Sequence, residues 1–304
     1  MRTSILLAIF SLLSFPVFSQ EAADNNQSIF DLFGDRQSTT YRAASGKPGP
    51  NYWQNSADYK IDVTLDEENE MIRGKISIDY TNNSPESLEF VWLHLEQNRF
   101  TETSRGTLTT PIQGNRYAGD MDGGYTISNV KAVAGRRGNP SGKHLINDTR
   151  MQVFFDEPIA AKGGTASISM NFEYKIPVKG MDRMGQLKVD DGTIFALAQW
   201  YPKMVVFDDV RGWNTEPYLG AGEFYLDYGD FEYNVTVPYN HIVVGSGELL
   251  NPQDVLTSEQ QNRMAKAAKS DETVHIITAD EVGDASKTRP KQSGTMIWKF
   301  KMEN

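Results

Sequence analysis

The chain has 304 residues and carries 30 Lys and Arg against 40 Asp and Glu, a formal net charge of −10. This acidic balance, without a cluster of basic side chains, argues against a nucleic-acid partner, because phosphate binding depends on clustered Lys and Arg. The lack of Cys excludes disulfides, thiolate metal ligands and cysteine nucleophiles, and the length is enough for one large core or two smaller ones.

Residues 1–19 predict a secretory signal. Arg2 precedes an apolar run over 5–13, Pro16 breaks a helix, and cleavage is expected after Ser19. The apolar run is shorter than the ~20 residues that a transmembrane helix needs. We therefore expect an exported protein, periplasmic or extracellular, with no membrane span in the mature chain.

Residues 20–50 are polar and end in Gly and Pro, which predicts a flexible lead-in before a single domain over 51–304. In this domain apolar and polar side chains alternate, which is typical of half-buried antiparallel strands. Clusters of turn-forming residues separate the alternating segments. The alternation is clearest over DYKIDVTL (58–65), TASISMNFEYKI (165–176) and FEYNVTV (231–237).

One helix is predicted, within residues 256–270. Thr257 is its expected N-cap, and Gln260 is placed to complete a capping box before a run of good helix formers. Many strands and little helix indicate an all-β fold, a large, mostly antiparallel β-sandwich-like domain with one short helix.

The four histidines do not predict a metal site. His94 lies in a segment that is apolar on both faces, which favours a packed histidine over a ligand. His144 and His241 lie near turns, and His275 is expected in the middle of a strand. None has the His-x-x-x-His spacing that places two imidazoles on one helical face. The residues themselves therefore indicate neither a catalytic nor a metal-binding residue.

Residues 192–237 are unusually rich in aromatic side chains around the acidic pair Asp208 and Asp209. Adjacent carboxylates in a strand point to opposite faces and make a poor acid–base pair. Two interpretations stay open: a loop whose aromatic rings cover the core, or an aromatic wall that borders a cleft. The following GSGEL (245–249) indicates a hairpin turn rather than a nucleotide loop, since it lacks a third Gly and a helix after it.

Several segments in succession resemble the N-terminal domain of bacterial zinc metallopeptidases of the aminopeptidase N (membrane alanyl aminopeptidase) family. The resemblance covers roughly residues 51–304, although no single segment is diagnostic. The segments that carry it are residues 52–98, AQWYPKMVVFDDVRGW (198–213), GEFYLDYGDFEYNVTVP (222–238) and HIVVGSGEL (241–249).

The resemblance implies a saddle-like β domain that caps a thermolysin-like catalytic domain, with the chain truncated before that domain. Zinc would be bound by the full-length parent, on a His-Glu-x-x-His helix beyond residue 304, and by no residue of this chain. Peptide substrate would be bound with the missing domain.

Two substrate-binding residues, Gln199 and Tyr201, follow from the family's Gln-x-Gln or Gln-x-Glu element. Gln199 fits that element, and Tyr201 stands where the family often has Gln or Glu.

The final KMEN (301–304) resembles the end of the family's Gly-x-Met-Glu-Asn motif, but Phe300 replaces the Gly. Because Met296, Trp298, Phe300 and Met302 alternate into it, we expect a structural strand rather than a substrate-anchoring role for Glu303.

The leading hypothesis is the cleft-shaping N-terminal domain of an exported zinc metallopeptidase, inactive by itself. An alternative is an exported β-sandwich module that binds glycans or proteins through Trp200, Tyr201 or Trp213. A third is a metallopeptidase relative that has lost its zinc.

Overall fold

The computed structural model describes residues 38–109, 123–179, 183–190, 192–220 and 225–303. The signal predicted over 1–19 lies outside the described residues, as does the predicted lead-in up to residue 37. The chain divides into two compact units, Met1–Tyr52 and Trp53–Asn304. In the described part of the first unit, turns are joined by a β-bridge between Arg42 and Pro48.

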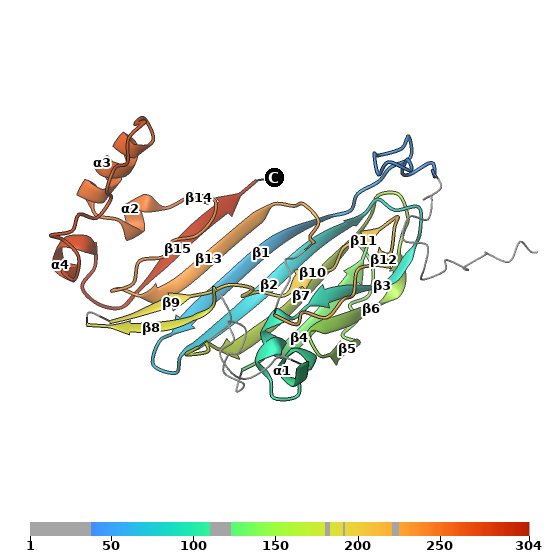
Figure 1. Cartoon of the computed structure of the whole chain (residues 1–304), viewed down its shortest axis with the longest axis horizontal. Coiled ribbons are helices and arrows are strands. Elements are labelled where there is room, and N and C mark those ends of the chain that lie inside the picture. The colour runs from blue at the N-terminus through green and yellow to red at the C-terminus, as the bar shows by residue number, and fades with distance from the viewer. Residues whose placement is uncertain (1–37, 110–122, 180–182, 191, 221–224, 304) are drawn as a thin grey trace, which may run out of the picture. The chain divides into compact units, whose positions relative to one another are not determined.

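A seven-stranded sheet organises the second unit (Figure 1). All its neighbouring strands are antiparallel except β1 and β13, which run parallel. The strands in spatial order are β14 (Glu248–Leu249), β15 (Thr295–Met302), β13 (Phe231–Pro238), β1 (Ser56–Asp66), β2 (Met71–Asn82), β7 (Gly164–Lys175) and β4 (Thr126–Ala134).

A four-stranded sheet and two short hairpins complete the β structure, so the expected all-β class is confirmed. The four strands in order are β10 (Lys203–Met204), β3 (Leu88–His94), β6 (Arg150–Ile159) and β5 (His144–Asn147). The hairpins are β8 (Gly185–Val189) with β9 (Gly192–Ala196), and β11 (Phe207–Asp208) with β12 (Gly212–Trp213).

The predicted helix is α3 (Ser258–Ala267), and both hydrogen bonds of the capping box between Thr257 and Gln260 are present. The other helical turns are not predicted by the sequence pattern, and each is only four or five residues long. These are η1 (Glu96–Phe100), α1 (Arg105–Thr109), α2 (Pro252–Val255) and α4 (Ala285–Thr288). Among the residues that the structure describes, no helix has the length and apolar character needed to cross a membrane.

The period-two pattern places one apolar face of the large sheet in the core. Ile61 of β1 lies opposite Ile76 of β2 and Tyr233 of β13, and Tyr233 in turn lies opposite Phe300 of β15. The alternate residues of these strands are mainly polar, such as Lys60, and face away from the core. Since register and alternation agree across the sheet, its apolar side chains form a continuous layer.

The last strand confirms the expected alternation as far as Phe300, because Met296, Trp298 and Phe300 are buried, whereas Met302 is exposed. Its outer edge is covered by Asn251, whose side-chain amide donates to the carbonyl of Ile297 and whose side-chain oxygen accepts from the N–H of Lys299. This side chain occupies backbone groups that would otherwise pair with a further strand.

Three expectations from the sequence are corrected. His275 lies in an irregular segment rather than in a strand. Residues 245–249 do not close a hairpin with the strand before them, because β14 pairs with β15 instead. The strand at 231–237 is antiparallel only to β15, since it runs parallel to β1. The last two differences arise from long-range pairing, to which alternation is insensitive.

Gly74 interrupts the apolar alternation of β2, and the ring of Phe172 on β7 covers it. A Cβ added at Gly74 would lie 2.8 Å from Val63 Cγ1 and would overlap Phe172 Cζ. We expect Gly74→Ala to lower the free energy of unfolding by about 1–3 kcal/mol, the usual cost of overpacking. A Gly-to-Ala change at an unstrained site normally stabilises instead. Lys75→Ala, on the opposite face, should change stability by less than about 0.5 kcal/mol in the same urea titrations. Stabilisation by Gly74→Ala would contradict this account of the packing.

Asp227 precedes β13 and supplies a pH-dependent contribution to stability. Burial, and then the charge of Asp208, raise the pKa of Asp227 to about 7, and its Oδ2 has no hydrogen-bond partner among the described residues. Because the folded chain holds this proton more tightly than the unfolded chain, the contribution is complete below about pH 4 and is lost as the pH rises to about 7.

We therefore expect the free energy of unfolding of the wild type, relative to Asp227→Asn, to fall between pH 4 and pH 7. The decrease should be about 1–2 kcal/mol, because solvent screens a partly exposed carboxylate. Chemical denaturation across this range measures it, with Asp230→Asn as the matched control. Parallel pH profiles for the wild type and Asp227→Asn would exclude a raised pKa.

Candidate functional site

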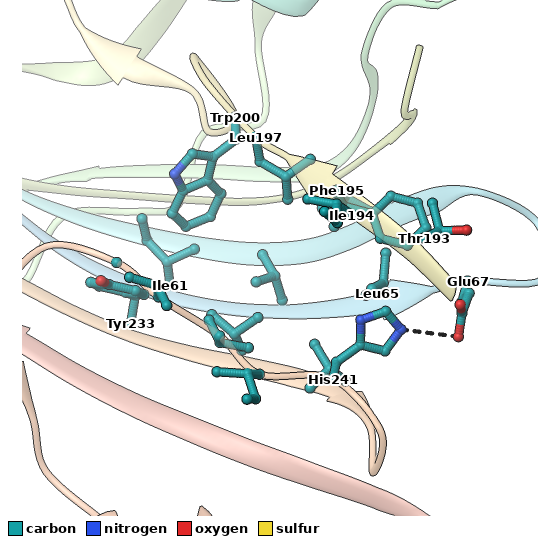
Figure 2. Close-up of a pocket in the computed structure, with 18 of the residues that line it drawn as sticks. Ile61, Leu65, Glu67, Thr193, Ile194, Phe195, Leu197, Trp200, Tyr233 and His241 are labelled. Atoms are coloured by element: carbon teal, nitrogen blue, oxygen red, sulfur yellow. Dashed lines mark ion pairs between the residues drawn. The ribbon is translucent and has the colours of Figure 1, made fainter. Parts of the chain in front are cut away.

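A cavity of about 640 Å³ opens on the apolar face of the large sheet. Strands β1 and β13 form one side, and the opposite side is formed by the β8–β9 hairpin and residues 197–201. Residues 240–246 complete the lining. Figure 2 shows Ile61 and Tyr233 on the first side, facing Phe195, Leu197 and Trp200 on the second. The volume lies within the usual range of small-molecule sites.

The cavity exists because β13 is incompletely covered. Phe231, Tyr233 and Val235 alternate into the same face as the buried Ile61 and Val63, yet each remains half-buried. Their alternation in the sequence predicts ordinary core residues. In the structure they are apolar side chains on the wall of an open cavity.

Aromatic rings hold one another in place along this wall. The ring centroid of Trp200 lies 4.9 Å from that of Tyr201 and 6.1 Å from that of Tyr233, in edge-to-face contacts. Tyr233 stacks on Phe300 at 5.0 Å, and Tyr201 meets Phe231 at 5.9 Å. Because each ring contacts at least one other, the wall has a defined shape without a ligand.

Charged groups occur at one end of the cavity. His241 Nε2 lies 3.0 Å from Glu67 Oε2, and Figure 2 shows this pair near Leu65. Arg289 joins the lining beside His241, because its Nε and Nη2 donate to the carbonyl of Asn240 at 2.9 and 2.7 Å. The cavity is therefore an apolar chamber with a polar end.

Gln199, predicted to bind substrate, has a left-handed backbone with φ of +50°. Gln97 Nε2 donates to the carbonyl oxygens of Gln199 and Ala198 at 2.9 and 3.1 Å, and the Tyr125 hydroxyl donates to Gln199 O at 3.3 Å. The half-buried side-chain amide of Gln199 has no hydrogen-bond partner among the residues that the structure describes. Of the two predicted residues, only Tyr201 lines the cavity.

A buried ion pair supports this segment from behind. Lys203 Nζ lies 2.9 Å from Glu96 Oε1, with side chains 6% and 0% exposed. His94 lies opposite Lys203 across β3 and β10 and is buried, so the expectation of a packed histidine is confirmed. Burial lowers the pKa of His94; the nearby Lys203 and Arg150 lower it further, and Glu96 opposes them.

The described residues do not fit the zinc ion that the family resemblance implies for the parent protein. No group of three or more His, Asp or Glu side chains in the described part of the chain could hold a metal. His94 lies among cations, His241 pairs with Glu67, and the His144 ring contacts the carbonyl of Gly142.

The aromatic segment fits both interpretations left open by the sequence. Trp200, Tyr201, Trp213 and Tyr218 pack against the core, and the first two also border the cavity. Trp213 packs on Phe207 at 5.0 Å rather than forming an open stacking platform. Tyr225 and Tyr228 are exposed, whereas the neighbouring Phe224 lies outside the described residues.

Asp208 has a structural role in the turn between β11 and β12. Its Oδ1 accepts hydrogen bonds from the backbone N–H groups of Val210 and Arg211, and its Oδ2 accepts one from Asn214. These bonds occupy both carboxylate oxygens.

Sequence reasoning missed the polar end of the cavity. Glu67 belongs to a turn after β1, His241 follows β13, and Arg289 follows α4. The distances between them in the sequence hide their proximity. Of these three residues, only Arg289 has a local sequence feature that could have singled it out. It is a basic residue directly before Pro290, in a segment without strand alternation.

The buried pair yields a stability prediction. Lys203→Met leaves the Glu96 carboxylate buried and unpaired, so it should lower the free energy of unfolding by about 3–5 kcal/mol. The double variant Glu96→Leu/Lys203→Met should recover most of this loss, because both charges are then absent. Lys188→Met, which removes an exposed partner 3.8 Å from Glu70, should cost under about 0.5 kcal/mol. Equal losses for Lys203→Met and Lys188→Met in denaturant titrations would show that the buried pair has no special weight.

No protein-family model and no curated protein matches the chain. The solved structures to which it is similar include M1 zinc metallopeptidases. One from Deinococcus radiodurans is 12% identical, with a TM-score of 0.36 over 84% of this chain and 40% of that chain. A mutant of that enzyme bound to a Tyr-Ser-Ala substrate gives the same identity and TM-score over 82% and 39% of the two chains.

A two-domain M1 zinc metallopeptidase mutant bound to L-arginine has a TM-score of 0.38 and 12% identity over 82% of this chain and 39% of that chain. The chain therefore spans about two fifths of the length of the solved structures that it matches.

Proposed function

We propose that the chain is the N-terminal, cleft-shaping domain of a longer, exported zinc metallopeptidase of the aminopeptidase type. The export proposal is supported by the signal-like residues 1–19, and the family proposal by the succession of similar segments over 51–304. The observation that carries the proposal is the conformation of Gln199, the residue that the resemblance assigns to the border of the substrate site.

The backbone at Gln199 is held in an unfavourable conformation by its neighbours. A left-handed residue other than Gly costs on the order of 1 kcal/mol or more and persists only where the surroundings determine it. Here the side chains of Gln97 and Tyr125 determine it through the carbonyl of Gln199. Strain of this kind, next to a side-chain amide without a protein partner, is typical of a residue that faces a ligand.

The exposed apolar face of the β8–β9 hairpin supports the proposal of a neighbouring domain. Leu187, Val189 and Ile194 lie on one face of this hairpin and are 59%, 46% and 54% exposed. Val189 and Ile194 also line the cavity, and three large apolar side chains together on a two-stranded ribbon are typical of a surface that another domain or a ligand covers. The hairpin leads directly into the segment with Gln199, so a domain docked there would lie beside the proposed substrate site.

In this proposal the chain contributes shape and positioning, whereas residues beyond the chain contribute the metal chemistry. The parent protein would bind peptides, with Gln199 and Tyr201 next to the first substrate residue. The described residues do not fit a zinc ion, so the zinc implied by the resemblance would be held by the catalytic domain.

The complete gene product tests the proposal. We expect its coding sequence to continue past residue 304 into a His-Glu-x-x-His helix, and the purified protein to contain one zinc ion. It should hydrolyse aminoacyl p-nitroanilides, whereas residues 20–304 alone should hydrolyse none. A stop codon directly after 304, or a continuation without that motif, would refute the proposal. A continuation with the motif but neither zinc nor hydrolysis would identify a relative that has lost its metal.

The role of Gln199 has its own test in the complete protein. Gln199→Ala should lower kcat/KM by about 10- to 100-fold, because a polar contact to the substrate is lost, while the thermal midpoint stays nearly unchanged. Gln54→Ala is the matched control, since Gln54 is an exposed glutamine of the same unit. Loss of stability with unchanged kcat/KM would assign Gln199 a structural role only.

A further inference from the structure

The cavity between β1, β13 and the β8–β9 hairpin has the features of a ligand site beyond the proposed peptidase function, although Tyr201, which that function places next to the substrate, also lines it. Phe231, Tyr233 and Val235 remain half-buried on its wall, which leaves apolar surface in contact with water. Filling about 640 Å³ with an apolar body would remove that surface from water. The ring contacts of Trp200 and Tyr233 fix the wall, so a ligand would find it already formed.

The charges at the polar end define the chemistry of the ligand. Glu67 Oε2 lies 3.0 Å from His241 Nε2, and the two form an ion pair when the imidazole is protonated. Arg289 is half-buried, and its Nε, Nη1 and Nη2 donate only to the neutral backbone carbonyls of Asn240 and Thr288. No carboxylate in the described part of the chain forms an ion pair with this guanidinium. An anion is therefore the complementary group for this end.

We propose that the cavity binds one small apolar carboxylate, with its hydrocarbon or aromatic part along Ile61, Val235 and Trp200 and its carboxylate at Arg289. Two sources share this chemistry: a free hydrocarbon acid and the C-terminal residue of an apolar peptide. Both present a hydrophobic body and a terminal carboxylate that the free N–H groups of Arg289 can bind.

The test is a calorimetric titration of the purified chain with decanoate and, separately, with decylammonium, which has the same hydrocarbon and the opposite charge. We expect decanoate to bind with 1:1 stoichiometry and a Kd of about 1–100 µM, and decylammonium at least ~10-fold more weakly. Binding of both with equal affinity would show that Arg289 does not select the ligand. Failure of decanoate to saturate at 1:1 would overturn the proposal.

Variants test separately the charge of Arg289 and the space inside the cavity. Arg289→Met should weaken decanoate binding by ~10-fold or more, and Arg289→Lys by less. Lys287→Met is the matched control, because Lys287 pairs with Asp284 at 3.3 Å and does not line the cavity. Val235→Phe keeps the charge and places a bulkier ring on the wall along which the hydrocarbon would lie, so it should weaken binding.

Thermal unfolding checks that each variant is folded. If Arg289→Met does not fold, the comparison of Arg289→Lys, Val235→Phe and the wild type decides the proposal. Undiminished binding to a folded Val235→Phe variant would place decanoate elsewhere and overturn it.

A last titration distinguishes the two sources. The peptide Leu-Leu-Phe is compared in its free-acid and C-terminally amidated forms. Tighter binding of the free-acid peptide than of decanoate supports a peptide C-terminus as the ligand, and the reverse order supports a hydrocarbon acid. Equal binding of the acid and amide forms would contradict recognition through a carboxylate.

Discussion

The buried ion pair between Glu96 and Lys203 is the interaction on which the candidate site depends. Moving two charges out of water costs several kcal/mol per ion, so such a pair persists only where its geometry is closely held. Here it joins the turn after β3 to the start of β10. Gln97, directly after Glu96, holds the carbonyl of Gln199, and Lys203 pairs with His94 across the sheet. One short turn thus fixes both ends of the segment that carries the aromatic wall.

The cavity follows from a mismatch between the two sheets. In the four-stranded sheet, β6 lies beside β4 and β7, at one side of the seven-stranded sheet. The parallel pairing of β13 with β1 extends the large sheet on the other side, where Figure 1 shows β13 and β15 beyond β1. The apolar side chains of β13 and β15 continue the apolar face of the sheet. The segment from the β8–β9 hairpin to Tyr201 covers this extension only in part. The apolar face of the large sheet is therefore covered by the core at one side and forms the wall of the cavity at the other.

Alternation predicts the fold where packing is decided within a strand and its neighbours. The buried faces of β1, β7 and β15 and the capping box at Thr257 are all readable from the sequence, because each depends on residues two to four positions apart. The parallel pairing of β1 and β13 is not readable, since 164 residues separate Asp66 from Phe231 and either direction buries the same face. Gly74 breaks the alternation of β2, because the ring of Phe172 on another strand occupies the space of its missing side chain. The sequence of β2 alone does not indicate this contact.

The candidate site is less predictable than the fold, because its properties arise from contacts distant in sequence. Tyr201 could be proposed from the resemblance of its segment, yet the left-handed backbone of Gln199 depends on Gln97 and Tyr125, which lie 102 and 74 residues earlier. The charge at the cavity's polar end depends on Arg289, which is held to Asn240 across 49 residues. A guanidinium bound only to neutral carbonyls cannot be distinguished in sequence from a solvated surface arginine. The availability of the Arg289 guanidinium for an anion becomes apparent only when the position of every nearby carboxylate is known.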